Sequence, residues 1–187
     1  IKKKATLTEA DLIFHCKEKN TLAQRILFDR YYQQCFHLAF RYLGNHHDVE
    51  DILSLAFTRI FKKIVSFENR GEGSLNKWIN TIVINESLRF VEKKRIVFYP
   101  DEIEHYMDEN LDDYFDSSID CEKLYAQINE LPIAQKLVFN LFVLDEYSHQ
   151  EIADKLKIPV NTSKSHLHRA KTQLRNKLVK VDDYEKE

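Results

Sequence analysis

The sequence predicts an all-α protein made of two small helical domains that an acidic, extended linker connects. The 187 residues include three glycines and three prolines, and so few helix breakers favour helices over a sandwich of short strands. Charge is unevenly spread, because ten Asp or Glu and no Lys or Arg lie between Ile96 and Glu122. The rest of the chain is basic, so we expect domains at residues 1–95 and 122–187 around a linker at 96–121.

Three helices are predicted at the start of the first domain. Residues 8–20 and 21–43 form the first two, and Gly44 is a natural stop for the second. Residues 47–64 give the clearest pattern, because their apolar side chains recur at steps of three and one. Acids in the first turn and lysines in the last match the preference of the helix dipole.

A loop and a fourth helix complete the first domain. Asn69–Ser74 (NRGEGS) contains two of the three glycines and predicts the loop. The segment LNKWINTIVINESLRFVEKKR follows, apolar on several sides and then basic. Its TIVI run is compatible with a strand, but the length without Gly or Pro favours a buried helix. Trp78 in this helix is more often a core residue than a stacking platform, and buried amides such as Asn80 and Asn85 need partners.

The second domain is expected to contain helices at 122–144, 148–156 and 159–180. Ser148 and Glu151 form a capping box at the start of the middle helix. A short turn at Lys157–Pro159 leads into the last helix. This succession of capped helix, tight turn and second helix is typical of a helix-turn-helix.

The last helix is basic on its outer side. Six Lys or Arg and no acid lie between Thr162 and Lys180. Its inward stripe is Ser163, Leu167, Ala170, Leu174 and Leu178. A helix that enters a DNA major groove avoids acids, because phosphates line both walls of the groove. A solvated amphipathic helix with a basic face is the alternative.

The sequence contains little that indicates catalysis. The sequence has two close histidine pairs, His166 with His168 and His46 with His47. No Cys or carboxylate stands at a spacing that would complete a metal site with either pair. Neither a phosphate-binding loop nor a nucleophile motif is present. The three cysteines are far apart, which indicates a reducing compartment. The start, IKKKATLTEADL, lacks the apolar core of a signal peptide, and no apolar run is long enough to span a bilayer. We expect a cytoplasmic protein that is not an enzyme, with no metal or cofactor.

Two stretches resemble the extracytoplasmic-function (ECF) sigma factors, the smallest relatives of the bacterial primary sigma factor. Residues 28–95, with FDRYYQQCFHLAFRYLGNHHDVEDILSLAFTRIFKKI and the loop and helix after it, resemble region 2. LPIAQKLVFNLFVLDEYSHQEIADKLKIPVNTSKSHLHRAKTQLRNKL resembles region 4. The resemblance implies an initiation factor that binds RNA polymerase core and directs promoter-specific transcription. Region 2 would bind core and melt the minus-10 element, and region 4 would read the minus-35 element.

The resemblance also implies which helix docks on polymerase. The helix at 47–64 corresponds to the one that binds the clamp helices of core. The residues that we expect to make this contact, the polymerase set, are Asp48, Asp51, Leu55, Arg59 and Lys62. The family usually has Gln-Glu where this chain has Ser54-Leu55. Leu55 is therefore either an isolated exposed leucine or part of an apolar contact with polymerase.

Two sets of DNA-binding residues follow from the resemblance. Unstacking a base costs free energy, and aromatic stacking and polar contacts with the flipped base offset that cost. The minus-10 set is Asn69, Arg70, Asn80, Asn85, Arg89, Lys93, Lys94 and Arg95. The minus-35 set, on the recognition helix, is Asn161, Thr162, Lys164, Ser165, His168, Arg169 and Lys171. His166 stands where the family often has Arg, so we expect His166 and His168 to make a weaker, more pH-sensitive anchor.

The expected partners are RNA polymerase core, promoter DNA and an anti-sigma factor or other targeting protein, with no small-molecule substrate. The linker lies where family members thread a segment through the polymerase cleft, so its carboxylates either mimic RNA or form a solvated spacer. Two other functions stay open. One is a stand-alone helix-turn-helix regulator, which would leave residues 28–95 unexplained. The other is an adaptor that binds polymerase but reads no promoter.

Overall fold

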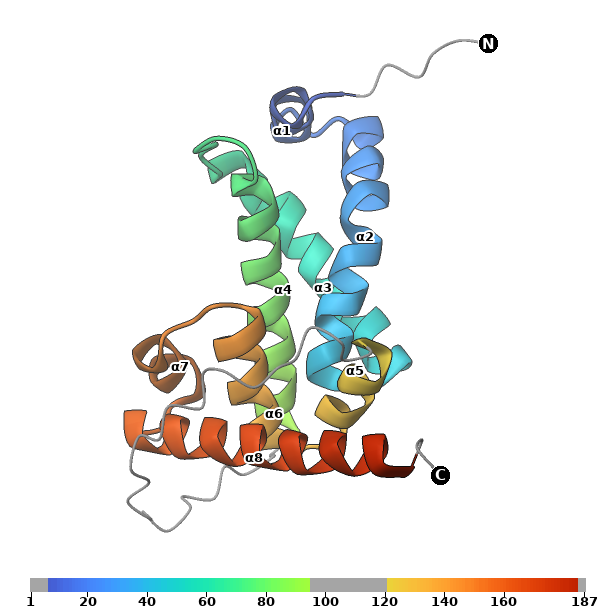
Figure 1. The fold of residues 1–187 in the computed structure, drawn as a ribbon. Coiled ribbons are helices and arrows are strands. Elements are labelled where there is room, and N and C mark those ends of the chain that lie inside the picture. Colours follow the sequence, from blue (N-terminus) through green and yellow to red (C-terminus); the bar gives the residue numbers. More distant parts are fainter. Residues whose placement is uncertain (1–6, 95–120, 185–187) are drawn as a thin grey trace. The chain divides into compact units, whose positions relative to one another are not determined.

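The computed structural model describes the backbone of residues 7–94 and 121–184, with the side chains of 7–94 and 124–177. Every regular element in these ranges is a helix (Figure 1), which confirms the all-α prediction. The contacts divide the chain into unit 1, Ile1–Lys94, and unit 2, Arg95–Glu187. The predicted linker lies outside the described residues except for Cys121, which begins α5. No helix in the described ranges is long and apolar enough to cross a membrane.

Unit 1 is a bundle in which α2, α3 and α4 pack against one another in pairs, while α1 packs on α2 and η1 (Figure 1). Its elements in chain order are α1 (Glu9–Lys17), α2 (Thr21–Leu43), α3 (His46–Lys63), the 3-10 turn η1 (Ile64–Ser66) and α4 (Ser74–Lys93). The TIVI run belongs to α4, so the strand alternative is wrong. Ile82, Val83 and Ile84 of this run are buried, and α4 packs on both α2 and α3, so tertiary burial outweighs their β propensity.

Side chains mark the ends of the first helices of unit 1. Asn20 accepts a hydrogen bond from the Ala23 amide at 3.0 Å to cap α2, and Asn45 accepts from the Asp48 amide at 3.2 Å to cap α3. Gly44 ends α2 in the left-handed region at φ 68°, as the sequence predicts. These caps fix α2 and α3 as an antiparallel pair joined by a short connection.

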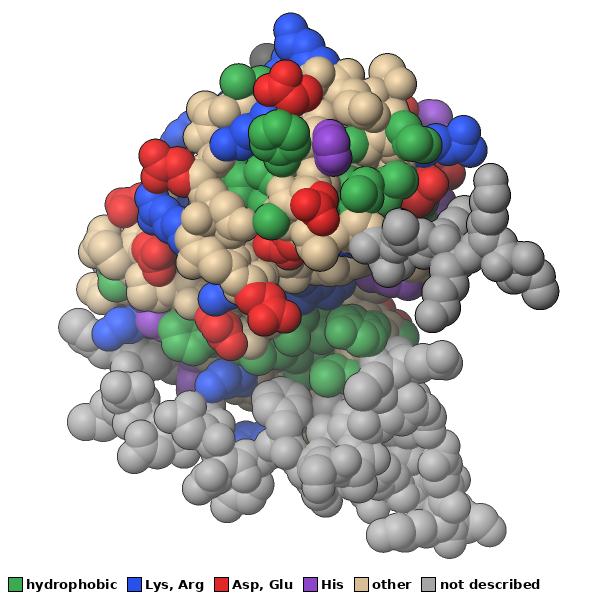
Figure 2. All heavy atoms as spheres, turned by 90° about the horizontal axis from the view of Figure 1, so that it is seen from above, with side chains coloured by type: hydrophobic (Ala, Val, Ile, Leu, Met, Phe, Trp, Pro, Cys, Tyr) green, Lys and Arg blue, Asp and Glu red, His purple; other side chains and the backbone are tan. Residues whose placement is uncertain are grey.

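The core of unit 1 consists of the apolar stripes of its three long helices. On α3 the buried residues are Val49, Ile52, Leu53, Ala56, Phe57 and Ile60, the stripe that the periodicity predicts. The surface is mixed. Figure 2, which looks onto the α1 end of unit 1, shows exposed hydrophobic side chains among charges of both signs.

Unit 2 is built around its last helix, against which α5, α6 and α7 pack. Its elements are α5 (Cys121–Asn129), α6 (Ile133–Phe139), the π-helical turn η2 (Asn140–Leu144), α7 (His149–Leu156) and α8 (Val160–Tyr184). The single helix predicted at 122–144 is wrong, because the chain turns at Glu130–Pro132 before α6. Pro132 lacks an N–H donor and disfavours helical geometry at Leu131, which explains the break.

Candidate nucleic-acid and polymerase interfaces

The loop between η1 and α4 is held in shape by its own polar groups. Asn69 Oδ1 accepts hydrogen bonds from the Gly71 amide and from Ser74 Oγ, both at 3.0 Å. Gly71 and Gly73 have φ values of 110° and 78°, in the region where other residues are strained. The loop is thus fixed before any ligand arrives. Asn69, a member of the minus-10 set, serves this internal structure.

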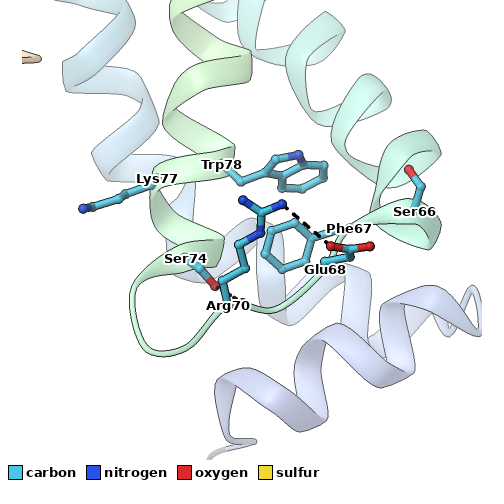
Figure 3. Close-up of a pocket in the computed structure, with 7 residues that line it drawn as sticks. All are labelled: Ser66, Phe67, Glu68, Arg70, Ser74, Lys77 and Trp78. Carbon is cyan, nitrogen blue, oxygen red and sulfur yellow. Dashed lines mark hydrogen bonds and ion pairs between the residues drawn. The ribbon is translucent and has the colours of Figure 1, made fainter. Parts of the chain in front are cut away.

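A pocket of about 690 Å³ lies beside this loop (Figure 3). The Phe67 and Trp78 rings line it with centroids 4.8 Å apart and planes at 41°. Arg70 reaches from the loop towards these rings, and its guanidinium pairs with Glu68 at 3.7 Å (Figure 3). The remaining lining residues are Ser66, Ser74 and Lys77.

The pocket combines aromatic surface with polar groups at its mouth. Its volume falls in the range of about 300–1,000 Å³ that is usual for small-molecule sites. A planar heterocycle can stack on an aromatic ring, and such stacking of a nucleobase contributes about 1–3 kcal/mol. The Arg70 and Glu68 side chains are 82% and 81% exposed, so both can turn towards a ligand. Trp78 is half-buried and lines this opening rather than lying in the core.

The other minus-10 residues are spread along α4. Asn80 accepts a hydrogen bond from Gln34 of α2 at 3.3 Å, and Asn85 is half-buried. Lys93 is exposed, whereas Lys94 pairs with Asp48 at 2.8 Å. Arg95 lies outside the described residues. The structure therefore brings Arg70 of this set to the pocket, but not the amides or the basic end of α4.

The polymerase set lies on one helix, α3, with unequal exposure. Leu55 is 57% exposed, and Asp51 and Lys62 are exposed as well. The Asp48 side chain is only 21% exposed because of its ion pair with Lys94. Arg59 is partly withdrawn into an ion pair with α4. The available face is therefore centred on Asp51, Leu55 and Lys62.

Glu86 is a buried carboxylate between two helices. Its side chain is 7% exposed, and Arg59 Nη1 of α3 and Arg89 Nη1 of α4 both donate to its Oε1, Arg89 at 2.7 Å. Charge-assisted bonds of this kind offset the desolvation of the carboxylate. One predicted polymerase residue and one predicted DNA residue therefore share a single acceptor atom.

In unit 2, α7 and α8 form the two helices of the predicted helix-turn-helix. The capping box is confirmed, since the Glu151 amide donates to Ser148 Oγ at 3.3 Å and the Ser148 amide donates to Glu151 Oε2 at 2.9 Å. The Ser148 hydroxyl also lies 2.7 Å from Glu151 Oε2 and donates to it. The hydrogen bonds that Ser148 donates, the side-chain one first, lower the pKa of Glu151. Lys157 ends α7 in the left-handed region at φ 57°. A bond of 2.9 Å between His149 Nδ1 and Ser163 Oγ joins α7 to α8.

The minus-35 set occupies the first turns of α8. Asn161 and Lys164 are exposed, while Thr162, Ser165, His168, Arg169 and Lys171 are half-buried. The Ser165 hydroxyl donates to the Asn161 carbonyl at 3.0 Å, so it is turned along its own helix. The expectation that His166 forms part of a pH-sensitive anchor for DNA is wrong. It is 3% exposed, because it lies between the buried residues Ser163 and Ala170 on the inner side of α8.

Sequence reasoning missed several residues of these sites. Phe67 lines the pocket from outside the quoted loop, and Lys77 and Glu86 have no motif of their own. For Glu86 the sequence does contain a partial signal, because an acid in a largely apolar helix requires a compensating charge. No group of three or more His, Cys, Asp or Glu that could hold a metal ion is found among the residues that the structure describes.

Comparison with known proteins gives the family. Residues 27–96 match Sigma-70 region 2, and residues 121–174 match Sigma-70, region 4. The chain is 32% identical over 166 residues to the ECF RNA polymerase sigma factor SigW of Bacillus subtilis, covering 81% of this chain and 87% of that protein. It is 28% identical over 151 residues to the ECF RNA polymerase sigma factor SigE of Mycolicibacterium smegmatis, covering 78% of this chain but 57% of that relative.

A solved structure supports the fold. The sigma factor RpoE of Bartonella quintana, determined in complex with the anti-sigma factor NepR, is similar at a TM-score of 0.51 and 21% identity, covering 84% of this chain and 97% of that chain. This likeness concerns the fold alone. The helices, the two matched regions and the sequence identity agree, and the chain therefore belongs to the sigma-70 family, within the ECF RNA polymerase sigma factors that direct transcription initiation at promoters.

Proposed function

We propose that this chain binds RNA polymerase core through α3, holds an unpaired base of the minus-10 element in the pocket beside α4, and reads the minus-35 element with α8. The pocket carries this proposal. Its fixed loop and its half-buried Trp78 ring suit an extruded base, because every base has a face that can stack. The Phe67 ring is 7% exposed and packs against Trp78. In this assignment the protein has no catalytic chemistry of its own, and it acts in the cytoplasm, where polymerase works.

The charges at the pocket mouth support a nucleic-acid ligand. Arg70 is an exposed cation that reaches over the pocket, and Lys77 is an exposed lining residue whose charged end points away from the rings (Figure 3). Cations on two sides of the opening suit the phosphates on either side of a flipped nucleotide. Lys93 is a further exposed cation, at the far end of α4. Asn80 acts with Gln34 in this proposal, because the two amides form one hydrogen-bonding surface across α2 and α4.

The polar start of α8 supports major-groove binding. Asn161 and Lys164 are exposed, and Thr162, Ser165, His168, Arg169 and Lys171 remain partly accessible. We propose that Lys164 and Lys171 contact phosphates and that Arg169 and Asn161 approach base edges. The bond between His149 and Ser163 would keep α8 at a fixed angle to α7 while it lies in the groove.

On the polymerase side, Leu55 gives the proposed contact an apolar centre with Asp51 and Lys62 around it. Such a centre with a charged rim is the usual anatomy of a protein interface. We further propose that a regulator of the anti-sigma kind masks these surfaces and that the acidic linker lies in the polymerase cleft. Replacing the acidic residues of the linker would show whether it mimics RNA or only spaces the two domains.

Reconstituted transcription is the decisive experiment. The purified protein would be mixed with bacterial core polymerase and sheared genomic DNA of its host, and RNA 5′ ends would be mapped. We expect discrete starts that need both proteins and share a motif near minus-10. Stable binding to core without defined starts would favour the adaptor. Specific duplex binding without any affinity for core would favour the stand-alone regulator.

The pocket can be tested separately, because Trp78 is the single tryptophan of the chain. Its fluorescence should change when a single strand carrying the mapped minus-10 element is added. Trp78→Ala should lower opening of a duplex promoter more than Trp78→Phe, which keeps a ring for stacking. A pre-melted promoter should rescue Trp78→Ala. An unchanged fluorescence signal on tight strand binding would remove the pocket from the proposal.

A further inference from the structure

We propose that Glu86 is a positioning residue that withholds Arg89 from DNA in the free protein and releases it when a phosphate of the promoter strand arrives. This inference rests on the proposed contact between α4 and melted DNA. It assigns a role to a residue that lies outside the minus-10 and polymerase sets. The geometry of the Arg59, Glu86 and Arg89 side chains carries it.

The exposure of the three side chains shows which partner can leave. The Glu86 side chain is 7% exposed, Arg59 is 40% exposed and Arg89 is 56% exposed. A carboxylate this buried needs a compensating charge at all times. Arg89, the most exposed of the three, lies one helical turn from Glu86 on the same helix, so a rotamer change on α4 is enough to free it.

Arg59 makes this release inexpensive. Both guanidinium groups donate to the same oxygen, Glu86 Oε1. When Arg89 turns to a phosphate, Arg59 still compensates the buried carboxylate. With a single arginine, the same movement would leave an unpaired buried charge, which is strongly unfavourable. The second guanidinium therefore changes Arg89 from a fixed structural partner into an exchangeable one.

The arrangement predicts opposite effects for two substitutions. Glu86→Gln removes the competing charge, so Arg89 is available to phosphate from the start and DNA binding should strengthen. Arg59→Ala leaves Arg89 as the remaining partner of Glu86, so DNA binding should weaken although Arg59 lies outside the proposed DNA contacts. A merely structural role for the trio would weaken binding in both variants.

The experiment uses the full chain and a fluorescein-labelled single-stranded DNA of mixed sequence, with anisotropy measured over a salt series. For Glu86→Gln we expect about two- to fivefold tighter binding, the effect of one exposed ionic contact. The slope of log affinity against log salt should steepen by about 0.7, the value for one more phosphate on a single strand. Arg59→Ala should bind more weakly than wild type.

Matched controls separate this mechanism from a change of net charge. Glu50→Gln removes an exposed acid of α3, and Arg25→Ala removes an arginine of α2 that is 80% exposed. Each control should shift affinity less than the corresponding test variant. Circular dichroism and thermal melting confirm folding of every variant. The double variant Glu86→Gln with Arg89→Ala should lose the gain in affinity.

The outcomes distinguish the inference from the proposed function. A folded Glu86→Gln protein that binds no more tightly than wild type overturns the inference, as does a gain that persists without Arg89. If Glu86→Gln does not fold, a folded Arg59→Ala protein supports the inference when its binding weakens and its salt slope flattens by about 0.7, the value for one phosphate fewer. Unchanged binding or an unchanged slope overturns it. Wild-type protein without salt-dependent strand binding would refute the DNA role of α4 as well.

Discussion

Lys94 Nζ lies 2.8 Å from Asp48 Oδ2 and joins the end of α4 to the first turn of α3. Sequence reasoning assigns these residues to different partners, Asp48 to polymerase and Lys94 to DNA. In the folded chain they neutralise each other, and Lys94 also lies over the Phe90 ring at 4.5 Å. The pair therefore stabilises the contact between α3 and α4, and a contact of either charge with an outside partner competes with it.

The strength of this pair can be measured with a double-mutant cycle. Asp48→Asn, Lys94→Gln and the double variant should give a coupling energy of about 0.2–1 kcal/mol, because the Lys94 side chain is 50% exposed. Urea unfolding at low and high salt is the measurement, and the coupling should shrink as salt rises. A coupling energy of zero at low salt would show that the pair does not contribute to stability.

Leu55 should matter for polymerase and not for folding. Because it is 57% exposed, Leu55→Ala should change the free energy of unfolding by less than about 0.5 kcal/mol. If the contact is apolar, affinity for core should fall by about fivefold or more, corresponding to a loss of about 1 kcal/mol or more.

Val65→Ala is the matched control, since Val65 is 55% exposed on the same unit and lies outside the polymerase set. Binding of the labelled proteins to core can be followed by fluorescence anisotropy. Equal affinities for the two variants would mean that Leu55 is an isolated exposed leucine.

The capping box of α7 gives a pH-dependent prediction. Hydrogen bonds from Ser148 lower the pKa of Glu151 below its ordinary value of 4.5. A carboxyl group with a depressed folded pKa stabilises the fold above its ordinary pKa, and this stabilisation is lost as pH falls through the folded pKa. Ser148→Ala should therefore be more destabilising at neutral pH than in acid.

At neutral pH the loss of this helix cap should cost about 0.5–2 kcal/mol. Amide hydrogen exchange of α7 over a pH series measures the effect locally, and Ser148→Thr should retain most of the stability. Equal destabilisation by Ser148→Ala at both ends of the pH range would contradict the role assigned to the Glu151 carboxylate.

Cys35 should be inert in the native protein. It is fully buried, and burial raises the pKa of its thiol to about 12, so very little reactive thiolate exists at mildly alkaline pH. Iodoacetamide should label Cys35 rapidly in urea and very slowly without it, as peptide mass spectrometry would show. Rapid native labelling would mean that α2 opens locally.

The sequence determined the helices and most of their ends. The stripe of α3, Gly44 after α2 and the Ser148–Glu151 box are local patterns, and local patterns need only the chain itself. The same is true of the basic start of α8. The break between α5 and α6 is a local effect as well, because Pro132 lacks an N–H donor and disfavours helical geometry at Leu131.

Only the tertiary structure decided what the polar side chains do. Arg59, Arg89, Asp48 and Lys94 are expected from the sequence to contact DNA or polymerase, yet all four are paired within unit 1. Arg59 pairs with Glu86 and Asp48 with Lys94 across α3 and α4, and Arg89 pairs with Glu86 within α4. Phe67 meets Trp78 because the loop between η1 and α4 brings them together, and His166 turns inward with the face of α8 that meets the other helices. Pairing and burial depend on residues far apart in the chain, so the sequence determined which side chains could bind, and packing determined which are available to do so.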